Sequence, residues 1–149
     1  MKILIDADGC PVVDITVRTA RKYAADCIIL CDTSHVFQKD GAATMIFSKG
    51  ADSVDFALVN RVSAGDLVIT QDYGLAAMCL ARNAFVLNQD GVEYTADNID
   101  ALLLARHTAR KIRSSGGRLR GPKKRTAAQD VIFEAELIRL LGKNAPQLH

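Results

Sequence analysis

The stretch Lys2-Ile-Leu-Ile-Asp-Ala-Asp-Gly-Cys-Pro11 decides how the rest of the chain is interpreted. It opens with an uninterrupted apolar run, Ile3–Ile5, which is typical of a strand buried on both faces of a sheet. The run stops at Asp6 and Asp8, and a Gly and a Pro then turn the chain toward a helix. Carboxylates at the carboxyl end of a buried strand lie at the edge where α/β sheets keep their ligand sites. The opening therefore predicts an acidic site at the end of the first strand.

Strand-like and helix-like segments alternate along the following residues. Short apolar runs at 27–31, 43–47, 66–70 and 84–87 predict four more strands, and the segments between them have helical apolar spacing. Such alternation predicts an α/β fold with three layers, in which a mainly parallel central sheet carries helices on both faces. The length suits a single domain over residues 1–149.

The helices expected at the two ends of the chain have recognisable boundaries. Pro11 suits the first turn of a helix that runs to about Ala25, because its missing N–H costs nothing there. A longer helix is expected from about 97 to 113, followed by a basic, glycine-rich stretch at about 114–125 that we predict to be a mobile loop. A C-terminal helix at about 126–141 then opens with a capping-box sequence.

The charge of the chain is divided between its two parts. Residues 1–100 carry 8 Lys and Arg against 14 Asp and Glu, whereas residues 101–149 carry 11 against 3, so the net charge of +2 hides an acidic body and a basic tail. Segment 101–129 contains nine basic residues and no acidic one. A basic segment beside an acidic site is suited to holding a phosphodiester backbone.

The composition also indicates in which cellular compartment the protein is expected. No apolar run approaches the roughly 18 residues that a membrane span needs, and the N-terminus does not have the pattern of a signal peptide. The four cysteines form no CxxC pair and lie in apparent core segments. We therefore expect reduced thiols in a cytoplasmic protein without a membrane partner.

Further carboxylates are expected at the edge where the first strand ends. Asp52 and Asp55 begin the helix after the third strand, and Asp72 follows the fourth strand. Crowded carboxylates repel one another unless a cation neutralises them, and an all-oxygen ligand set suits Mg²⁺ or Mn²⁺. The predicted metal ligands are Asp6, Asp8, Asp52, Asp55 and Asp72.

A simpler interpretation is that these acids cap helices, since Asp is a favoured N-cap residue. Taken singly, Asp8, Asp52 and Asp72 each suit that role, and Asp8 is the more natural cap of the two N-terminal acids. Asp6 ends a strand and has no helix to cap. Thr70 either orients a carboxylate or a water at the site, or only satisfies a strand end.

The predicted nucleic-acid contacts come mainly from the basic segment. Backbone N–H groups and cations at a helix start are suited to phosphate binding. Few aromatic residues are available for base stacking, with Phe37 and Tyr73 as the candidates, so binding would depend on backbone and shape. The predicted contacts are Lys49, Arg118, Arg120, Lys123, Lys124 and Arg125.

Two segments resemble known nucleases. Val68-Ile-Thr-Gln-Asp-Tyr-Gly-Leu75 resembles the strand-Thr-x-Asp-x-x-Leu segment of PIN-domain and NYN-type nucleases, and Lys49-Gly-Ala-Asp52-Ser-Val-Asp55 is similar to an NYN helix start. Asp6 matches their first-strand acid. This resemblance implies a PIN-like fold with an acidic metal cluster at the strand ends.

Over nearly its full length the chain also resembles the YaiI/YqxD family of uncharacterised bacterial proteins. The similar segments are Asp6–Pro11, Gly50–Asp55, Gly65–Asp72, and Gly121-Pro122 together with Thr126 and Asp130. The family usually reads Asp-Ala-Cys-Pro at the first segment, so Gly9 is a small departure. This resemblance implies a PIN-like fold and no particular substrate.

These observations predict a metal-dependent nuclease that acts on RNA or DNA, with RNA as the expected partner. Its catalytic residues would be Asp6, Thr70 and Asp72, with Mg²⁺ or Mn²⁺ as cofactor. One alternative is a PIN-like module that binds RNA or a partner without catalysis. A third interpretation is a haloacid dehalogenase-type phosphatase, because Ile5–Gly9 resembles the first motif of that class, although Cys10 replaces its usual Thr or Val and the downstream motifs are missing.

Overall fold

The computed structural model describes residues 1–49, 53–114, 116 and 124–144. Six strands form one sheet with the order β3-β2-β1-β4-β5-β6. Strands β1 to β5 are parallel, and β6 pairs antiparallel with β5. The strands are β1 (Lys2–Asp6), β2 (Asp26–Asp32), β3 (Ala43–Phe47), β4 (Leu67–Ile69), β5 (Phe85–Leu87) and β6 (Glu93–Tyr94).

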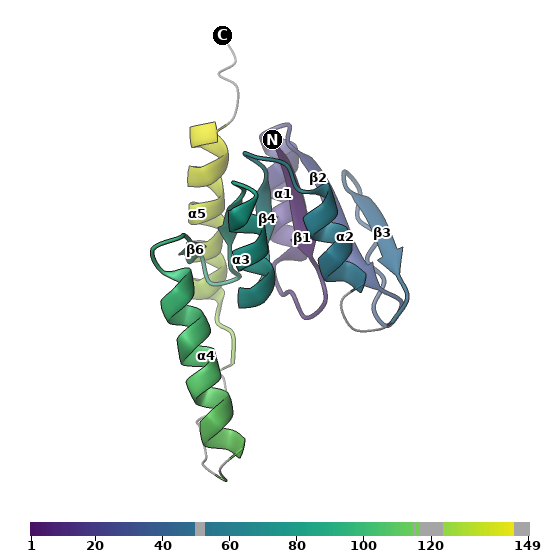
Figure 1. The fold of residues 1–149 in the computed structure, drawn as a ribbon. Helices are drawn as coiled ribbons and strands as arrows, with labels where there is room; N and C mark the ends of the chain where they lie inside the picture. Colours follow the sequence, from purple (N-terminus) through teal and green to yellow (C-terminus); the bar gives the residue numbers. More distant parts are fainter. Residues whose placement is uncertain (50–52, 115, 117–123, 145–149) are drawn as a thin grey trace.

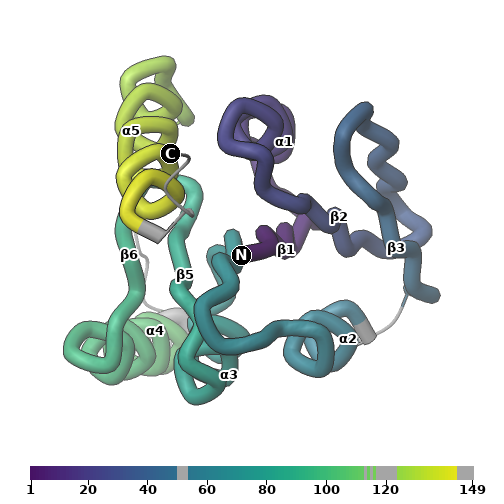
Figure 2. The backbone as a smooth tube through the Cα atoms, turned by 90° about the horizontal axis from the view of Figure 1, so that it is seen from above, coloured from purple at the N-terminus to yellow at the C-terminus, as the bar shows by residue number. Residues whose placement is uncertain are grey.

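Helices cover both faces of this sheet, as Figure 2 shows from above: α1 and α5 lie on one side of the strands, and α2, α3 and α4 lie on the other. The predicted three-layer α/β fold with a mainly parallel sheet is therefore confirmed, and it is consistent with a PIN-like architecture. The helices are α1 (Val13–Lys22), α2 (Ser53–Arg61), α3 (Tyr73–Ala81), α4 (Ile99–Ser114) and α5 (Ala127–Asn144).

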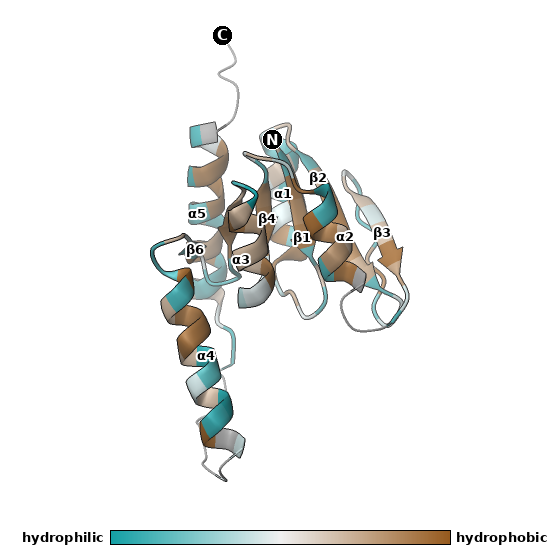
Figure 3. Ribbon diagram, viewed as in Figure 1, coloured by the Kyte–Doolittle hydropathy of each residue, from teal (hydrophilic) through white to brown (hydrophobic). Residues whose placement is uncertain are grey.

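The central strands β1 and β4 are apolar on both faces because each face packs on a helical layer. Ile3 and Ile5 belong to the core beneath α1 and α5, whereas Leu4 belongs to the core beneath α2 and α3. All three are fully buried, and Figure 3 shows the hydrophobic colouring concentrated in these strands. An apolar run without alternation is what a parallel strand covered on both sides requires.

The predicted boundaries differ from the structure at several places. Helix α1 begins at Val13 rather than Pro11, because Pro11 lies in the turn before it, and the helix ends at Lys22 rather than near Ala25. Strand β6 is not among the predicted strands, since two residues are too few to show a periodic pattern. Most of the predicted mobile loop at 114–125 lies outside the described residues.

Helix α5 begins as its capping-box sequence predicts. The backbone N–H of Thr126 donates to the side-chain oxygen Oε1 of Gln129 at 2.7 Å.

Among the described residues, no helix combines the length and apolar character that crossing a bilayer requires.

Candidate acidic site at the ends of β1 and β4

The acidic site lies where the chain changes direction across the sheet. From β1 the chain continues outward through β2 to β3, and it then returns through α2 to β4 on the other side of β1. The carboxyl ends of β1 and β4 are therefore neighbours at the switch point of the sheet, the usual location of ligand sites in this fold class. Figure 1 shows these two strands side by side at the centre of the molecule.

Thr70 joins the two strand ends. Its hydroxyl Oγ1 donates to Oδ2 of Asp6, the last residue of β1, at 2.8 Å. Thr70 is only 2% exposed, and its backbone N–H donates to the carbonyl of Leu87 on β5. Of the two predicted roles for Thr70, the structure supports the one in which it orients a carboxylate.

Asp72 is held next to this pair. Its backbone N–H donates to Thr70 Oγ1 at 3.1 Å, and its own Oδ1 accepts from the backbone N–H of Leu75 at 3.1 Å. Asp72 is thus the N-cap of α3, as the capping interpretation expects, and it also faces Asp6. The two interpretations of Asp72 are compatible, because a capping carboxylate keeps lone pairs for a second partner.

The environment of Asp6 disfavours its charge. Burial raises the pKa of Asp6 to about 6, against an ordinary value of 3.8, and the Thr70 hydrogen bond only partly offsets this. The negative charges of Asp55, Asp72 and Asp8 make a smaller contribution to this raised pKa. Asp55 comes from the first turn of α2 and Asp72 caps α3, so acids from the starts of two helices and from the turn after β1 act on one carboxyl group.

Asp8 is not the helix cap that its position suggests. The N-cap of α1 is Val12, without any side-chain hydrogen bond, and Oδ1 of Asp8 is buried with no hydrogen-bond partner. Burial raises the pKa of Asp8, and the neighbouring charge of Asp32 raises it too, against an opposing hydrogen bond from the Asp32 backbone N–H. A buried carboxylate oxygen without a donor is a position that a cation suits.

The structure describes all but one of the predicted metal ligands. Asp52 lies outside the described residues. Within the part of the chain that the structure describes, no three His, Cys, Asp or Glu side chains are grouped closely enough to hold a metal ion by themselves.

The predicted phosphate-binding residues fall into three groups. Arg118, Arg120 and Lys123 lie outside the described residues, and Lys49 and Lys124 are exposed. Hydrogen bonds from Ser34 are the main cause of the lowered pKa of the Asp32 carboxyl, and the positive charge of Lys49 makes a smaller contribution.

Arg125 has a structural position instead. Its Nε donates to Asp130 at 2.8 Å, and its two terminal nitrogens donate to Asp90 at 3.1 Å and to the carbonyl of Gln89 at 2.7 Å. Its guanidinium therefore ties the start of α5 to the loop after β5. This planar fork is matched to protein oxygens, so the contacts in the structure are structural ones, and the phosphate contact at Arg125 stays a prediction.

An arginine outside the predicted set lies beside an acid of the site, and a second one follows it on the same helix. Nη1 of Arg106 is 3.8 Å from Oδ1 of Asp72, and Arg110 follows one turn later on the same face of α4. Figure 1 shows α4 extending beyond the edge at which the strands end. The acid-free segment that contains both residues was visible in the sequence, but the contact with Asp72 was not.

The cysteines do not contribute a reactive group. Cys27, Cys31 and Cys79 are buried, Cys10 is half-buried, and all four are free, as expected for reduced thiols. Burial raises the pKa of the Cys10 thiol to about 11, so it is not activated as a nucleophile.

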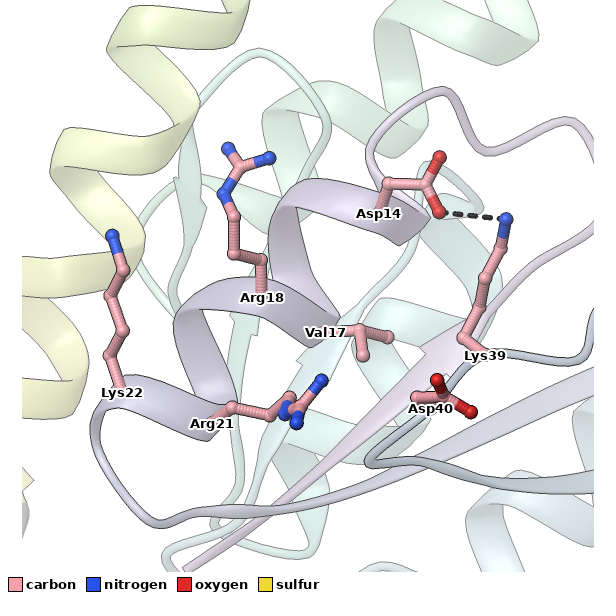
Figure 4. Close-up of a pocket in the computed structure, with 7 residues that line it drawn as sticks. All are labelled: Asp14, Val17, Arg18, Arg21, Lys22, Lys39 and Asp40. Carbon is pink, nitrogen blue, oxygen red and sulfur yellow. Dashed lines mark ion pairs between the residues drawn. The ribbon is translucent and has the colours of Figure 1, made fainter.

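A second concave surface lies on the outer side of α1, shown in Figure 4. An ion pair of 2.8 Å between Lys39 Nζ and Asp14 Oδ1 closes one side of it. It is on the α1 face of the sheet, whereas Asp72 begins α3 on the opposite face, so it does not belong to the acidic site. Its lining residues are Asp14, Val17, Arg18, Arg21, Lys22, Lys39 and Asp40.

The fold and this site define a class: three-layer α/β proteins with acidic residues at the switch point of a mainly parallel sheet. A family model described as "Uncharacterized BCR, YaiI/YqxD family" matches residues 4–143. The chain therefore belongs to the YaiI/YqxD family, which confirms the resemblance seen in its motifs.

Curated relatives extend over nearly the same length. A UPF0178 protein of Exiguobacterium sibiricum is 53% identical over 141 residues, which cover 95% of this chain and 96% of the relative. UPF0178 proteins of Clostridium acetobutylicum and Ruminiclostridium cellulolyticum are 47% and 50% identical, covering 95% and 93% of this chain and 97% and 90% of their own lengths. No solved structure matches the chain.

Proposed function

We propose that the protein is a metal-dependent nuclease that cleaves RNA or DNA at the acidic site. The observation that carries the proposal is the hydrogen-bonded arrangement of Asp6, Thr70 and Asp72 at the switch point of the sheet, where burial and three neighbouring acids also raise the pKa of Asp6. Perturbed carboxyl groups of this kind concentrate at functional sites. A cluster that repels itself gains stability when a cation binds.

The carboxylates named at the site suit a hard cation. Asp6, Asp8, Asp55 and Asp72 offer only carboxylate oxygens, and Oδ1 of Asp8 is buried without a partner. Mg²⁺ is commonly held by one or two carboxylates together with waters and substrate phosphates, so a complete protein cage is not required. Asp52, just outside the described residues, is a further proposed ligand.

Each residue at the site then has a distinct task. When bound, Mg²⁺ or Mn²⁺ would activate a water for attack on phosphorus and neutralise charge on the phosphate. Thr70 fixes the direction of the Asp6 carboxylate, and the α3 cap fixes that of Asp72. Arg106, beside Asp72, is positioned to pair with a phosphate oxygen that approaches the acids.

The test is a cleavage assay over mixed RNA and DNA with Mn²⁺ added. Asp72→Asn keeps a capping oxygen while removing the charge, and we expect it to lose roughly 100-fold or more of the activity. Asp26→Asn is the matched control, since Asp26 is an exposed acid at the opposite edge of the same sheet. Equal activity in both variants, or no metal-dependent cleavage by the unaltered chain, contradicts the proposal.

A second candidate is a nucleic-acid-binding module without catalysis. It is favoured by the finding that, over the described residues, no three metal-ligating side chains form a compact group. Binding that is unchanged in Asp6→Ala, in a chain that never cleaves, would support the module. Hydrolysis of a small chromogenic phosphomonoester, abolished in Asp6→Asn, would instead support a phosphatase.

A further inference from the structure

A groove lies directly beside the acidic site, between the start of α3 and the outer half of α4. It has a volume of about 420 Å³ and is lined by Tyr73, Ala105, Arg106, Ala109 and Arg110. This size is within the range of pockets that take small organic groups. Tyr73 immediately follows Asp72, so the groove begins one residue from an acid of the site.

The walls of the groove combine small side chains with cations. Ala105 and Ala109 are four residues apart on α4, as are Arg106 and Arg110, so each pair forms a row along one side of the helix. The two alanines leave room for a ligand to approach the helix, and the two guanidinium groups flank that space. Arg110 makes no ion pair within the described part of the chain, and its side chain is exposed.

The arginine nearer to the acids is held only weakly. The Arg106–Asp72 pair spans 3.8 Å, and its side chains are 41% and 38% exposed. Exposed pairs of this kind contribute little to stability, so Arg106 can turn to a phosphate without a large cost. Phosphate oxygens match the planar guanidinium fork better than a single distant carboxylate oxygen does.

Tyr73 supplies a rigid aromatic surface. Its ring meets that of Tyr94 edge-on, with centroids 5.6 Å apart and an angle of 89°, and Tyr94 is buried. Phe37 stacks on His35 at 4.3 Å, and both Phe37 and Tyr73 are partly buried against the core. Tyr73 lines the α3–α4 groove, and nucleobases stack readily on such rings.

We propose that this α3–α4 groove binds one unpaired nucleotide next to the cleaved bond, with its base against Tyr73 and its phosphates on Arg106 and Arg110. This inference rests on the proposed nuclease function and specifies its substrate as single-stranded at that position. A duplex buries its bases in the stack and offers only its backbone to such a groove. The ring and the alanines therefore favour a single strand.

The test is binding measured by fluorescence anisotropy in EDTA, where no metal-dependent cleavage occurs. The probes are a dye-labelled single-stranded RNA, a DNA of the same sequence, and a perfectly paired duplex. We expect the single strands to bind at least about 10-fold tighter than the duplex. Tyr73→Ala should lose about 10-fold in affinity, and Tyr73→Phe should retain most of it.

The arginine contacts are tested separately, by the salt dependence of binding. Arg110→Ala should weaken binding and lower the slope of log affinity against log salt by about 1. Arg82→Ala is the matched control, because Arg82 is an exposed arginine at the far end of α3. Thermal unfolding of each variant verifies folding, and Arg110 and Arg82 are both at the surface.

The outcomes separate the groove from the nuclease activity. Binding that depends on Tyr73 and Arg110 in a chain that never cleaves supports the groove and contradicts catalysis. Cleavage together with binding that is indifferent to Tyr73→Ala and Arg110→Ala overturns the groove. Equal affinity for single strands and duplex also overturns it.

Discussion

Strands β1 and β4 lie side by side, and an acid stands at each end of the pair in contrasting surroundings. Before β4, the buried Asp66 accepts from the backbone N–H of Lys2 at 3.1 Å, from Lys2 Nζ at 2.5 Å and from the N–H of Ser63 at 2.8 Å. Burial acts to raise the pKa of Asp66, but these donors outweigh it and the pKa is lowered.

At the other end, Asp6 receives a hydrogen bond from Thr70 and faces like charges, so its pKa rises to about 6. At the edge where β4 begins, the fold supplies Asp66 with hydrogen-bond donors that stabilise its charge. At the opposite edge it gathers acids whose repulsion only a proton or a cation relieves. From this difference we infer that the edge with Asp66 is structural, and we propose that the edge with Asp6 binds a ligand.

The largest expected effect on stability is at the structural edge. Asp66→Ala leaves the Lys2 ammonium and the Ser63 N–H without their acceptor, and it should lower the free energy of unfolding by about 2–4 kcal/mol. Urea unfolding measures this loss. Asp26→Ala, an exposed acid at the same edge, should change stability by less than about 0.5 kcal/mol. Equal values for the two variants would remove the contrast between the edges.

The opposite sign is expected at the acidic edge. Asp6→Asn removes a charge that the folded state disfavours, so at about pH 7.5 it should raise the free energy of unfolding by about 1–3 kcal/mol. Urea unfolding of the variant and the unaltered chain at several pH values tests this.

The pH dependence of that gain follows from the raised pKa of Asp6. Between the ordinary value of 3.8 and about 6, the folded chain keeps a proton that the unfolded chain releases. The unaltered protein therefore loses stability as pH rises through this window, and the deficit is complete above it. The advantage of Asp6→Asn should vanish below the window. If Asp6→Asn remained more stable than the unaltered chain below this window, the gain in stability would come from packing and not from the removed charge.

A smaller loss is expected at Arg125, whose guanidinium joins Asp130, Asp90 and the Gln89 carbonyl. Arg125→Ala should cost about 1–2 kcal/mol, because two of its partners are carboxylates and its side chain is only 22% exposed. Thermal unfolding of Arg125→Ala is compared with that of Lys124→Ala, a control at an exposed neighbouring residue. Equal melting temperatures would mean that the contacts of Arg125 contribute nothing to stability.

The smallest effect on stability is expected at Arg106. Arg106→Ala removes a solvent-exposed ion pair with Asp72 and should change the free energy of unfolding by less than about 0.5 kcal/mol. Metal-dependent cleavage should nevertheless fall by roughly 10-fold, since a phosphate contact is lost. A large loss of stability with unchanged cleavage would make Arg106 a structural residue.

The sequence predicted the elements of this fold better than their contacts. The apolar run Ile3–Ile5 identified a strand covered on both faces, and the acids after it lie at the carboxyl end of that strand, as the sequence predicts. The strand order depends on how α2 crosses the sheet, and local patterns do not encode that crossing. Strand β6 is held by pairing with β5 over two residues, too few for a pattern to show.

The site shows the same division between local and long-range information. Asp72 and Leu75 are three residues apart, so the cap was readable from spacing. The Thr70–Asp6 bond spans 64 positions and Arg125–Asp90 spans 35, and both follow from the packing of separate elements. Asp8 has the spacing of a cap, yet no helix N–H reaches its Oδ1.

We propose that the acids at the ends of β1 and β4 are gathered to bind a cation. Thermal unfolding during a Mn²⁺ titration of the unaltered chain and of Asp6→Asn tests this proposal. An ion that binds only the folded state raises the melting temperature as its concentration rises. We predict a rise in the unaltered chain and little or none in Asp6→Asn. A melting temperature that is independent of Mn²⁺, or one that rises equally in both proteins, would contradict the claim.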